Sequence, residues 1–569
     1  MFTSLPSTVD DFQFWSWSEM EPYYLDLASR SIKDSNIHAW LADWSSIKEL
    51  VLETYNRLYV ATTCNTNDQE MDRRFNVFLE DIFPNAEAAD QTLKSKLLCS
   101  GVKPGGYEQQ LKNMRLDDSI FHVENLPLLA GERRLNSEYD RIIGAQSIEW
   151  EGKEVTLSQL LPVYLDLDRP RRERAWRLAS QRQLQDRQAF NELWQKYIRL
   201  RGQLAENSGE SNYRAYRWKQ LLRTDYSPAD CFALHQAIED VVVPAAHRIY
   251  EAHRKTMGLD SLRPWDMDWD RAVDPLGRPP LQPFKSVTEL EEKVSYIFNR
   301  VDPQLGQYFA TMRQHNLLDL DNRIGKAPGG YCIDYPRLRL TFIFMNAVGI
   351  HEDVQTLLHE GGHAFHVFET AHLPYYQQRE AGIEFAEVAS TAMELLSSPY
   401  LARQEGGFYS QEDTARARAE HLKGFIRFWP YMAVVDAFQH WAYENISLAS
   451  DPDYCDTKWV ELWQRFMPGV DWSGFEDVLA SGWQHKAHIF QAPFYYIEYG
   501  LAGLGAIQMW SNSLNDHAAA VQAYRKALSL GGTVPLPKLF ETAGANFSFQ
   551  RSTITKAVDL LEDTIASLE

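Results

Sequence analysis

The 569 residues of the chain combine 44% hydrophobic with 24% charged residues, a composition typical of globular proteins. No run approaches the ~18 consecutive apolar residues that a membrane-spanning helix needs, so we expect no membrane partner. The net charge of -21 argues against a nucleic acid partner, because phosphate binding needs clustered lysine and arginine side chains.

The sequence begins MFTSLPSTVDDFQFW, which has neither the basic stretch nor the apolar stretch of a secretory signal. We therefore expect a cytoplasmic protein. The five cysteines are scattered and form no CxxC pair, which argues against both a disulfide framework and a thiolate metal site. Reduced thiols agree with the expected compartment.

Helical periodicity dominates from about Ser7 to Lys255. Segments such as SIKELVLETYNRLYVATT and NELWQKYIRLRGQLAENS carry apolar residues at spacings of three and four, as amphipathic helices do. Five prolines after Arg263 then exclude a continuous helix between Leu259 and Pro283. That stretch predicts a loop or a junction between two lobes.

A small β-hairpin is predicted between Lys326 and Gly349. The segment KAPGGYCIDYPRLRLTFIFMNAVG contains two short runs of β-branched and aromatic residues, preceded by glycines. Helical patterns dominate again after this hairpin, so it lies directly before a histidine-rich helix.

The stretch LLHEGGHAFHVFE places three histidines at spacings of four and three. We expect Asp353 to cap a helix that ends before Pro374. In such a helix His359 and His363 direct their imidazoles to one locus, and Glu360 projects beside it. This is the geometry of the HExxH zinc site.

The alternatives are a chance HExxH match and histidines that are only hydrogen-bonded in the core. Two adjacent glycines argue against chance, because each costs a helix about 1 kcal/mol relative to alanine. They make sense if another backbone or a substrate passes close to the helix. Two histidines and one carboxylate already form a common set of catalytic zinc ligands, so a third histidine is not needed as a ligand. We therefore expect His366 to pack in the core or to support a ligand by a hydrogen bond.

The following segment, REAGIEFAEVASTAMELLSS, offers a carboxylate as third ligand. Four glutamates fall within about 80° on a helical wheel: Glu380, Glu384, Glu387 and Glu394. A solvated acidic face is the simpler explanation. Alanines and large apolar residues surround the stripe, however, which favours carboxylates buried beside a cation.

HEGGHAFH followed by EFAEVASTAMELL resembles the M3 family of zinc oligopeptidases, the group of thimet oligopeptidase and oligoendopeptidase F. Their pattern is HExGHxxH with a glutamate about 24 to 25 residues beyond the second histidine, where this chain has Glu387. Further matching stretches are SLRPWD at Ser261–Asp266, GGY at Gly329–Tyr331 and HIFQAPFYYIEYGLAGLGA at His488–Ala506. The last is most similar to the Pz-peptidase-like oligoendopeptidases.

The resemblance implies that His359, His363 and Glu387 bind one Zn²⁺ per chain and that Glu360 is the general base. Glu384 and Glu394 would then orient the imidazoles by hydrogen bonds. The glycines of the GGY stretch, together with its tyrosine, would let a peptide substrate approach as an extended strand; these residues are Gly329, Gly330 and Tyr331.

Tyr496 and Tyr499 lie three apart in PFYYIEYG, shortly after His488. From spacing alone such aromatic residues are usually core residues. The resemblance instead implies that a histidine and two tyrosines face the zinc and stabilise the oxyanion. Some family members have a tyrosine where this chain has Pro493, so Tyr495 is the neighbouring alternative for the register.

We therefore expect a mainly α-helical protein with two helical lobes flanking a deep substrate channel, and a zincin-type HExxH helix beside a small β-sheet. An N-terminal helical lobe would span residues 1–200 and a catalytic domain residues 201–569, with the lobes interwoven. The expected activity is zinc-dependent endopeptidase cleavage of short oligopeptides. A helical metallocarboxypeptidase and a catalytically silent peptide-binding protein are the alternatives.

Overall fold

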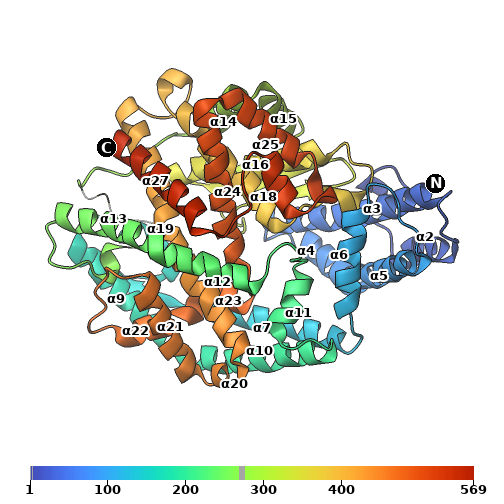
Figure 1. Ribbon diagram of the computed structural model, residues 1–569, viewed down its shortest axis with the longest axis horizontal. Helices are drawn as coiled ribbons and strands as arrows, with labels where there is room; N and C mark the ends of the chain where they lie inside the picture. The colour runs from blue at the N-terminus through green and yellow to red at the C-terminus, as the bar shows by residue number, and fades with distance from the viewer. Residues whose placement is uncertain (1, 3, 268–273, 275) are drawn as a thin grey trace. The chain divides into compact units, whose positions relative to one another are not determined.

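The computed structural model describes residues 2, 4–267, 274 and 276–569. The chain is mainly helical, with small sheets (Figure 1), as the sequence predicted. It divides into two compact units of three segments each. Unit 1 comprises Met1–Asp118, Leu281–Ala417 and Leu501–Phe547, and unit 2 comprises Ser119–Pro280, Arg418–Gly500 and Ser548–Glu569. Each unit therefore includes residues from both sides of position 200, where the sequence analysis placed the boundary between the N-terminal lobe and the catalytic domain.

Unit 1 contains the first helices of the chain, the helices on either side of the predicted hairpin, and two helices from its third segment. Its principal helices are α1 (Val9–Phe12), α2 (Trp17–Ser29), α3 (Ile37–Cys64), α4 (Gln69–Val77), α5 (Phe83–Ser100), α14 (Val287–Val301), α15 (Pro303–Gln314), α16 (His351–Thr370), α17 (Tyr376–Arg379), α18 (Ile383–Ser397), α25 (His517–Leu528) and α26 (Leu536–Thr542).

Unit 2 contains most of the remaining helices. They are α7 (Asn125–Gly144), α8 (Leu161–Tyr164), α9 (Arg169–Gln185), α10 (Arg187–Asn207), α11 (Tyr213–Gln220), α12 (Pro228–Ala237), α13 (Val243–Thr256), α20 (Ile446–Ala449), α21 (Pro452–Phe466), α22 (Glu476–Ala480), α23 (Ala487–Phe490) and α27 (Arg551–Leu568). Three of the five boundaries between the units fall within further helices: α6 (Glu108–Ile120), α19 (Gln411–Glu444) and α24 (Tyr496–Asn515).

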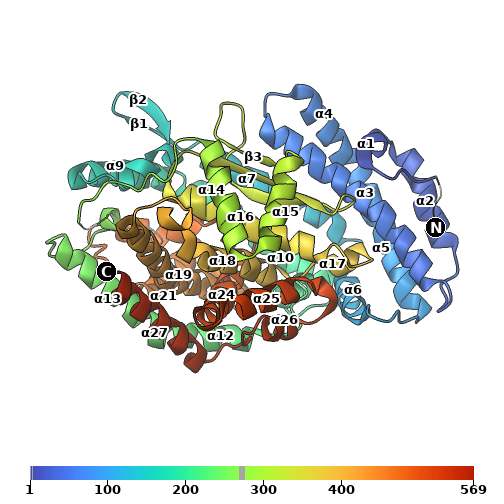
Figure 2. The same cartoon turned by 90° about the horizontal axis from the view of Figure 1, so that it is seen from above.

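The first segment of unit 1 folds around tryptophans of α3. Helices α2, α3 and α5 lie side by side (Figure 2). Trp40 and Trp44 are almost fully buried between them, and the indole N–H of Trp40 donates to the Leu27 carbonyl at 3.0 Å. The period of three and four in α3 thus reflects a buried face, because tryptophans at i and i+4 lie on the same side of a helix.

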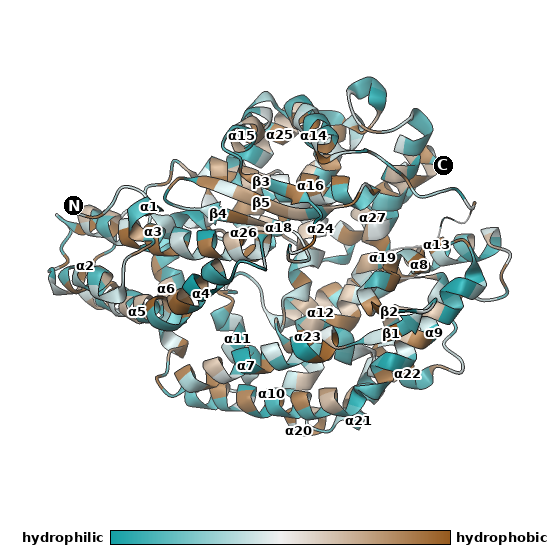
Figure 3. Ribbon diagram, turned by 180° about the vertical axis from the view of Figure 1, so that it is seen from behind, coloured by the Kyte–Doolittle hydropathy of each residue, from teal (hydrophilic) through white to brown (hydrophobic). Residues whose placement is uncertain are grey.

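The three-stranded sheet of unit 1 confirms the predicted hairpin. The strands β3 (Leu318–Asp321), β4 (Tyr331–Tyr335) and β5 (Leu340–Ala347) lie in the order β3-β5-β4 (Figure 3). β5 pairs antiparallel with β4 and parallel with β3. The central strand has the uninterrupted run LTFIFM because both of its faces are covered, and it leads straight into α16.

A second small hairpin lies in unit 2, in the part of the sequence where we expected few strands. It joins β1 (Ser147–Trp150) to β2 (Lys153–Thr156). Glu151 and Gly152 form its turn, and both have positive φ. Such a two-residue turn matches the twist of antiparallel strands.

The predicted loop from Leu259 to Pro283 includes residues 268–273 and 275, which are outside the described residues. Its described part holds a 3₁₀ turn at Pro264–Asp266. Asp266 is buried and accepts hydrogen bonds from Arg169 at 2.7 and 2.8 Å. The division between units 2 and 1 at Pro280/Leu281 falls within the same stretch.

None of the helices in the described part of the chain is long and apolar enough to cross a membrane.

Candidate functional site

Helix α16 begins at His351, directly after β5, and its first turn is fixed by Asp353. The Oδ2 atom of Asp353 accepts hydrogen bonds from the backbone N–H groups of Val348, Gly349 and Ile350 at 2.8, 2.7 and 3.0 Å. Asp353 therefore caps the helix from its third position, while Ile350 occupies the N-cap position that the sequence assigned to Asp353. The carboxylate also places negative charge at the helix N-terminus, where it is stabilising.

The two glycines of HEGGH face two different neighbours. A Cβ atom on Gly362 would lie 2.5 Å from the Ala389 carbonyl oxygen and 2.6 Å from Ser390 Cα, both in the backbone of α18. A Cβ atom on Gly361 would lie 2.4 Å from the ring of Phe298 in α14. Gly362 thus lets α16 approach α18, which lies next to it in Figure 1, and Gly361 makes room for α14. These close approaches offset the low helix propensity of glycine.

His359, His363 and Glu387 converge across the α16–α18 contact. One donor atom from each residue lies within 4.8 Å of the others. Glu387 Oε2 is 3.5 Å from His359 Nε2 and 3.8 Å from His363 Nε2. Tetrahedral ligands at the ~2.1 Å bond length of zinc lie about 3.4 Å apart. The donor set of two imidazoles and one carboxylate therefore fits Zn²⁺ in both chemistry and spacing.

Two hydrogen bonds orient these candidate ligands. His359 Nδ1 lies 2.6 Å from Glu394 Oε1, which leaves Nε2 directed toward Glu387. Ser390 Oγ, one turn after Glu387 on α18, donates to Glu387 Oε2 at 3.2 Å. A carboxylate that accepts the Nδ1 proton of an imidazole fixes the tautomer in which Nε2 is free to bind a metal.

The two histidines have opposite electrostatic surroundings. Burial lowers the pKa of His359, but the carboxylates of Glu387 and Glu394 outweigh burial and hold this pKa well above its usual value. Burial, together with the positive charge of His359, lowers the pKa of His363 to about 4. Strongly shifted pKa values of neighbouring groups are typical of functional sites.

Glu360 is 8% exposed and lies beside the candidate ligands. Burial raises its pKa to about 7; the positive charge of His359 opposes this shift, and so does a hydrogen bond from the backbone N–H of Cys332 in β4. The carboxylates of Glu387 and Glu394 add to it. A carboxyl group with a pKa near neutrality can both take up and release a proton at physiological pH.

The predicted acidic stripe is only partly correct. Glu384, Glu387 and Glu394 belong to α18, and Glu384 is buried with 6% exposure in its first turn. Glu380 instead lies before the helix, is exposed, and accepts a hydrogen bond from Tyr376. The helical wheel was wrong for Glu380 because α18 begins only at Ile383, after a break at Gly382.

His366 is buried against α18, with its ring edge-on to that of Phe385 and the ring centres 6.2 Å apart. Its Nε2 atom has no hydrogen-bond partner in the part of the chain that the structure describes. Burial lowers its pKa to about 4, and the charge of His363 contributes. A neutral imidazole packed against an aromatic ring is the placement expected for a packing residue.

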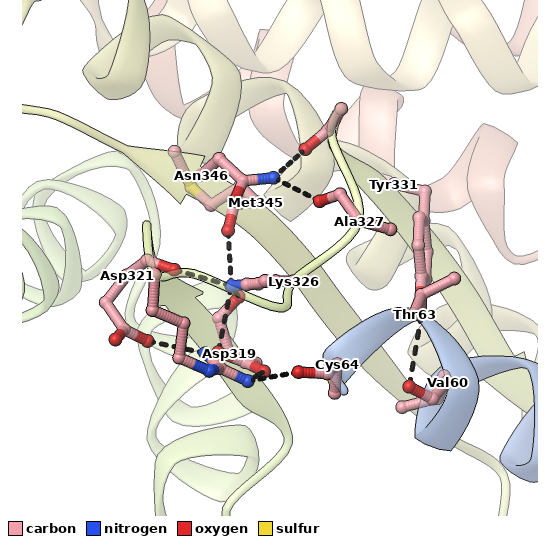
Figure 4. Close-up of polar contacts among 12 residues, drawn as sticks. Val60, Thr63, Cys64, Asp319, Asp321, Lys326, Ala327, Tyr331, Met345 and Asn346 are labelled. Atoms are coloured by element: carbon pink, nitrogen blue, oxygen red, sulfur yellow. Dashed lines mark hydrogen bonds and ion pairs between the residues drawn. The ribbon is translucent and has the colours of Figure 1, made fainter. Parts of the chain in front are cut away.

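The glycine loop before β4 is anchored by Lys326 (Figure 4). The Lys326 side chain is fully buried, and its Nζ donates to the Met345 carbonyl at 2.6 Å, the Asp321 carbonyl at 2.7 Å and Asp319 Oδ1 at 2.9 Å. The ammonium also lies 4.5 Å from the centre of the Phe344 ring. A buried charge with this many acceptors fixes the loop to β3 and β5.

Gly329, Gly330 and Tyr331 follow this anchor at the edge of the sheet. Asn346 Nδ2 donates to the Gly329 carbonyl at 2.9 Å, and Gly329 has a φ of 98°, a conformation that favours glycine. Tyr331 stacks on Phe344, and its hydroxyl lies 2.5 Å from Thr63 Oγ1. Both glycines are exposed and lie directly before β4, an edge strand of the sheet.

His488, Tyr496 and Tyr499 come together within unit 2. The ring of His488 lies 4.8 Å from that of Tyr496 and 6.2 Å from that of Tyr499, and the two tyrosine rings are 5.8 Å apart. Tyr495 also reaches this cluster, at 5.8 Å from His488. Burial lowers the pKa of His488 to about 4, and the nearby charge of Lys486 adds to the shift. The histidine is therefore neutral at physiological pH.

A second group of possible metal donors was not singled out from the sequence. Cys231, Asp436 and His440 are buried together in unit 2. Asp436 Oδ2 lies 2.9 Å from His235 Nε2 and 3.3 Å from His440 Nε2. Because Arg214 can only donate to His440 Nδ1, at 3.3 Å, the His440 proton is on Nε2 and faces Asp436. This group is a hydrogen-bonded network around a buried carboxylate.

An HExxH motif on α16, a carboxylate donor on α18 and an edge strand beside them are the features of a helical metallopeptidase. The family model "Peptidase family M3" matches residues 165–558, more than half of the chain. The chain belongs to peptidase family M3. Its members are in general zinc metalloproteases, and membership places the chain among the metallopeptidases, a class of hydrolases.

Solved structures agree over nearly the whole chain. The structure of Pz peptidase A with inhibitor 2 has 26% identity and a TM-score of 0.87, with 97% of each chain covered. A structure assigned as oligoendopeptidase F has 26% identity and a TM-score of 0.88, covering 98% of this chain and 99% of its own. Oligopeptidase PepF of Bacillus subtilis (strain 168) is 22% identical over 333 residues, 58% of this chain. That match spans 47% of the relative, about half its length.

Proposed function

We propose that the chain is a zinc-dependent endopeptidase that hydrolyses internal bonds of short oligopeptides. The observation that carries the proposal is the convergence of His359, His363 and Glu387 with Glu360 beside them. In this proposal the first three residues hold one Zn²⁺ per chain. Bound there, Zn²⁺ supplies a Lewis acid that acidifies a water molecule and polarises the scissile carbonyl.

Glu360 moves the proton in this proposal. Its carboxylate removes a proton from the attacking water and then transfers it to the leaving amine, so one residue acts as base and as acid. The burial of Glu360 beside the proposed ligands supports this role, because a base must lie within reach of the water whose proton it takes. Glu394 and Glu384 orient the ligands, and the hydrogen bond from Glu394 to His359 supports this for Glu394.

His488, Tyr496 and Tyr499 are proposed to stabilise the negative oxygen that develops during attack, since hydroxyl and N–H donors lower the energy of such an oxyanion. Their mutual contacts within unit 2 and their match to the family motif support the assignment. Gly329, Gly330 and Tyr331 are proposed to bind the substrate backbone as an added strand along β4. The short peptide substrate and the cytoplasmic location expected from the sequence belong to the same proposal.

The test is cleavage of an internally quenched peptide whose two ends are both blocked. We expect cleavage of the purified protein, loss of cleavage after chelation, and recovery when one equivalent of zinc is returned. Mass spectrometry of the products separates an endopeptidase from a carboxypeptidase, because a carboxypeptidase needs a free C-terminus. If the protein trims peptides with a free C-terminus but does not cleave blocked peptides, the endopeptidase assignment is wrong. If the zinc-loaded protein cleaves neither kind of peptide, it is a silent binding protein.

A further inference from the structure

The turn before α24 contains Phe494 in a conformation that residues other than glycine rarely adopt. Phe494 has a φ of 65° and is fully buried. Its ring packs within 5.2 to 5.8 Å of the rings of Trp218, His440 and Tyr443. A bulky residue keeps a left-handed conformation only where its surroundings determine the backbone. Interactions on both sides of this residue must therefore hold it.

Gln439 of α19 holds the N–H side. Its Oε1 accepts a hydrogen bond from the Phe494 N–H at 2.6 Å. The Nε2 of the same amide donates to the Val435 carbonyl of α19 at 3.1 Å, which fixes the amide so that its oxygen faces Phe494. Gln439 is fully buried, so water cannot replace either bond.

Arg223 holds the carbonyl side. Its Nη2 donates to the Phe494 carbonyl and to Glu498 Oε1, both at 2.5 Å. Glu498 lies in the first turn of α24, between the two tyrosines of the cluster, and is 1% exposed. One guanidinium therefore ties the turn at Phe494 to the start of the helix. Planar Arg donors suit such a double contact better than a single ammonium.

We infer that Gln439 and Arg223 are positioning residues for the peptidase reaction, acting through Tyr496 and Tyr499. This inference rests on the proposed role of the tyrosines in oxyanion stabilisation. α24 begins at Tyr496, two residues after Phe494. A change in φ or ψ at Phe494 would thus rotate the first turn of α24 and move both hydroxyls relative to His488. Oxyanion donors act only when they are held near their productive position.

The experiment compares Gln439→Met with two matched variants. Methionine keeps the volume of glutamine but removes the acceptor for the Phe494 N–H, so we expect kcat to fall roughly 10 to 100-fold with KM within threefold and zinc content unchanged. Gln439→Glu, protonated in this fully buried position, keeps an acceptor for the Phe494 N–H and a donor for the Val435 carbonyl, so it should recover most of kcat. Gln110→Met makes the same substitution at a buried glutamine of unit 1, whose amide donates to Gly532, and should leave kcat within threefold.

A double-mutant cycle with Tyr496→Phe shows whether Gln439 acts through the tyrosine. If it does, Gln439→Met adds less than threefold in the Tyr496→Phe background, since the hydroxyl that it positions is already gone. Fully multiplicative losses would overturn the inference, as would wild-type kcat in folded Gln439→Met. Should Gln439→Met fail to fold, Arg223→Lys is the second variant, with the same expected kcat loss and the same cycle.

The outcomes separate this inference from the proposed function. If Tyr496→Phe is impaired while Gln439→Met and Arg223→Lys are fully active, the positioning role is wrong and the oxyanion role of Tyr496 stands. Fully active Tyr496→Phe and Tyr499→Phe would reject the oxyanion role, and the positioning role with it. A loss in all of these variants, coupled in the cycle, supports both.

Discussion

Glu360 adjoins His359 in the chain, yet its carboxylate is not part of the converging donor set. Because the proposed ligands do not include it, Glu360→Gln should leave zinc bound and lower turnover by several orders of magnitude, through loss of the proton transfer. Metal analysis and turnover on the same sample check both halves. Turnover close to that of the unchanged protein would remove Glu360 from the mechanism.

The carboxylates of α18 should differ in what their removal does to zinc. Glu387→Ala removes a donor and should lose most of the zinc. Glu394→Ala removes the hydrogen bond to His359, and Glu384→Ala removes a buried neighbour, so we expect affinity to weaken roughly 10 to 100-fold. Competition with a calibrated chelator measures the three affinities. An empty site in Glu384→Ala with zinc retained in Glu387→Ala would contradict the ligand assignment.

At this scale the sequence and the family motif predicted which side chains would meet, and also that Glu394 would orient an imidazole, but not the other residues that hold the site. The i, i+4 histidines and the downstream glutamate follow from spacing and from the family motif, so His359, His363 and Glu387 could be proposed in advance. Ser390 and Phe298 could not, because nothing in their local pattern marks them as neighbours of the site. Glu380 was misplaced because a helical wheel cannot show where a helix begins.

At the scale of elements, the contact between α16 and α18 depends on one missing side chain. Gly362→Ala would put a Cβ 2.5 Å from the Ala389 carbonyl, and backbone cannot move aside as a side chain can. We expect a loss of about 1–3 kcal/mol or more in the free energy of unfolding, together with weaker zinc binding. Gly361→Ala should be milder, because the atom in its way is the tip of the Phe298 ring.

The matched control is Gly424→Ala in α19. No atom lies within 4 Å of the added Cβ there, so the substitution should stabilise the protein by about 0.5–1 kcal/mol through helix propensity alone. Denaturant unfolding of the three variants measures the differences. If Gly362→Ala were as stable as Gly424→Ala, the close approach of α16 and α18 would be wrong.

The hairpin before α16 and the helix itself were predictable, because runs of β-branched residues and a period of 3.6 are local signals. The pairing of β3 with β5 was not, since a parallel partner carries no turn signal next to it. The contacts of Arg223 and Gln439 with Phe494 could not be predicted either, because the three residues are far apart in the sequence and neither Arg223 nor Gln439 belongs to a motif.

At the scale of the whole molecule, buried histidines should make stability depend on pH. Burial lowers the pKa of His366, His485 and His488 to about 4 each. The unfolded chain protonates histidine near 6.5, so it binds more protons than the folded chain between about 6.5 and 4. Stability should therefore fall as the pH drops through this window, and these groups should have no effect above it.

Thermal melting from pH 8 to pH 5 on chelated protein checks this, since chelation removes the competing effect of metal loss. His485→Gln should give a shallower fall than the unchanged chain, because one of the three groups is gone. A melting temperature that stays constant between pH 7 and pH 5 would mean that these histidines are not held neutral.

The segment order of unit 1 also sets when its candidate site can form during synthesis. Helix α18 is covered by residues made much later: Tyr524 donates to the Ala389 carbonyl at 2.9 Å, and Gly505 lies against Val388. At 5–20 residues per second, roughly 8 to 30 s separate the synthesis of Ser397 from that of Phe547. A nascent chain thus carries both histidines of HEGGH long before the packing that fixes Glu387 exists, and peptide cleavage can begin only after the residues up to Phe547 have been made.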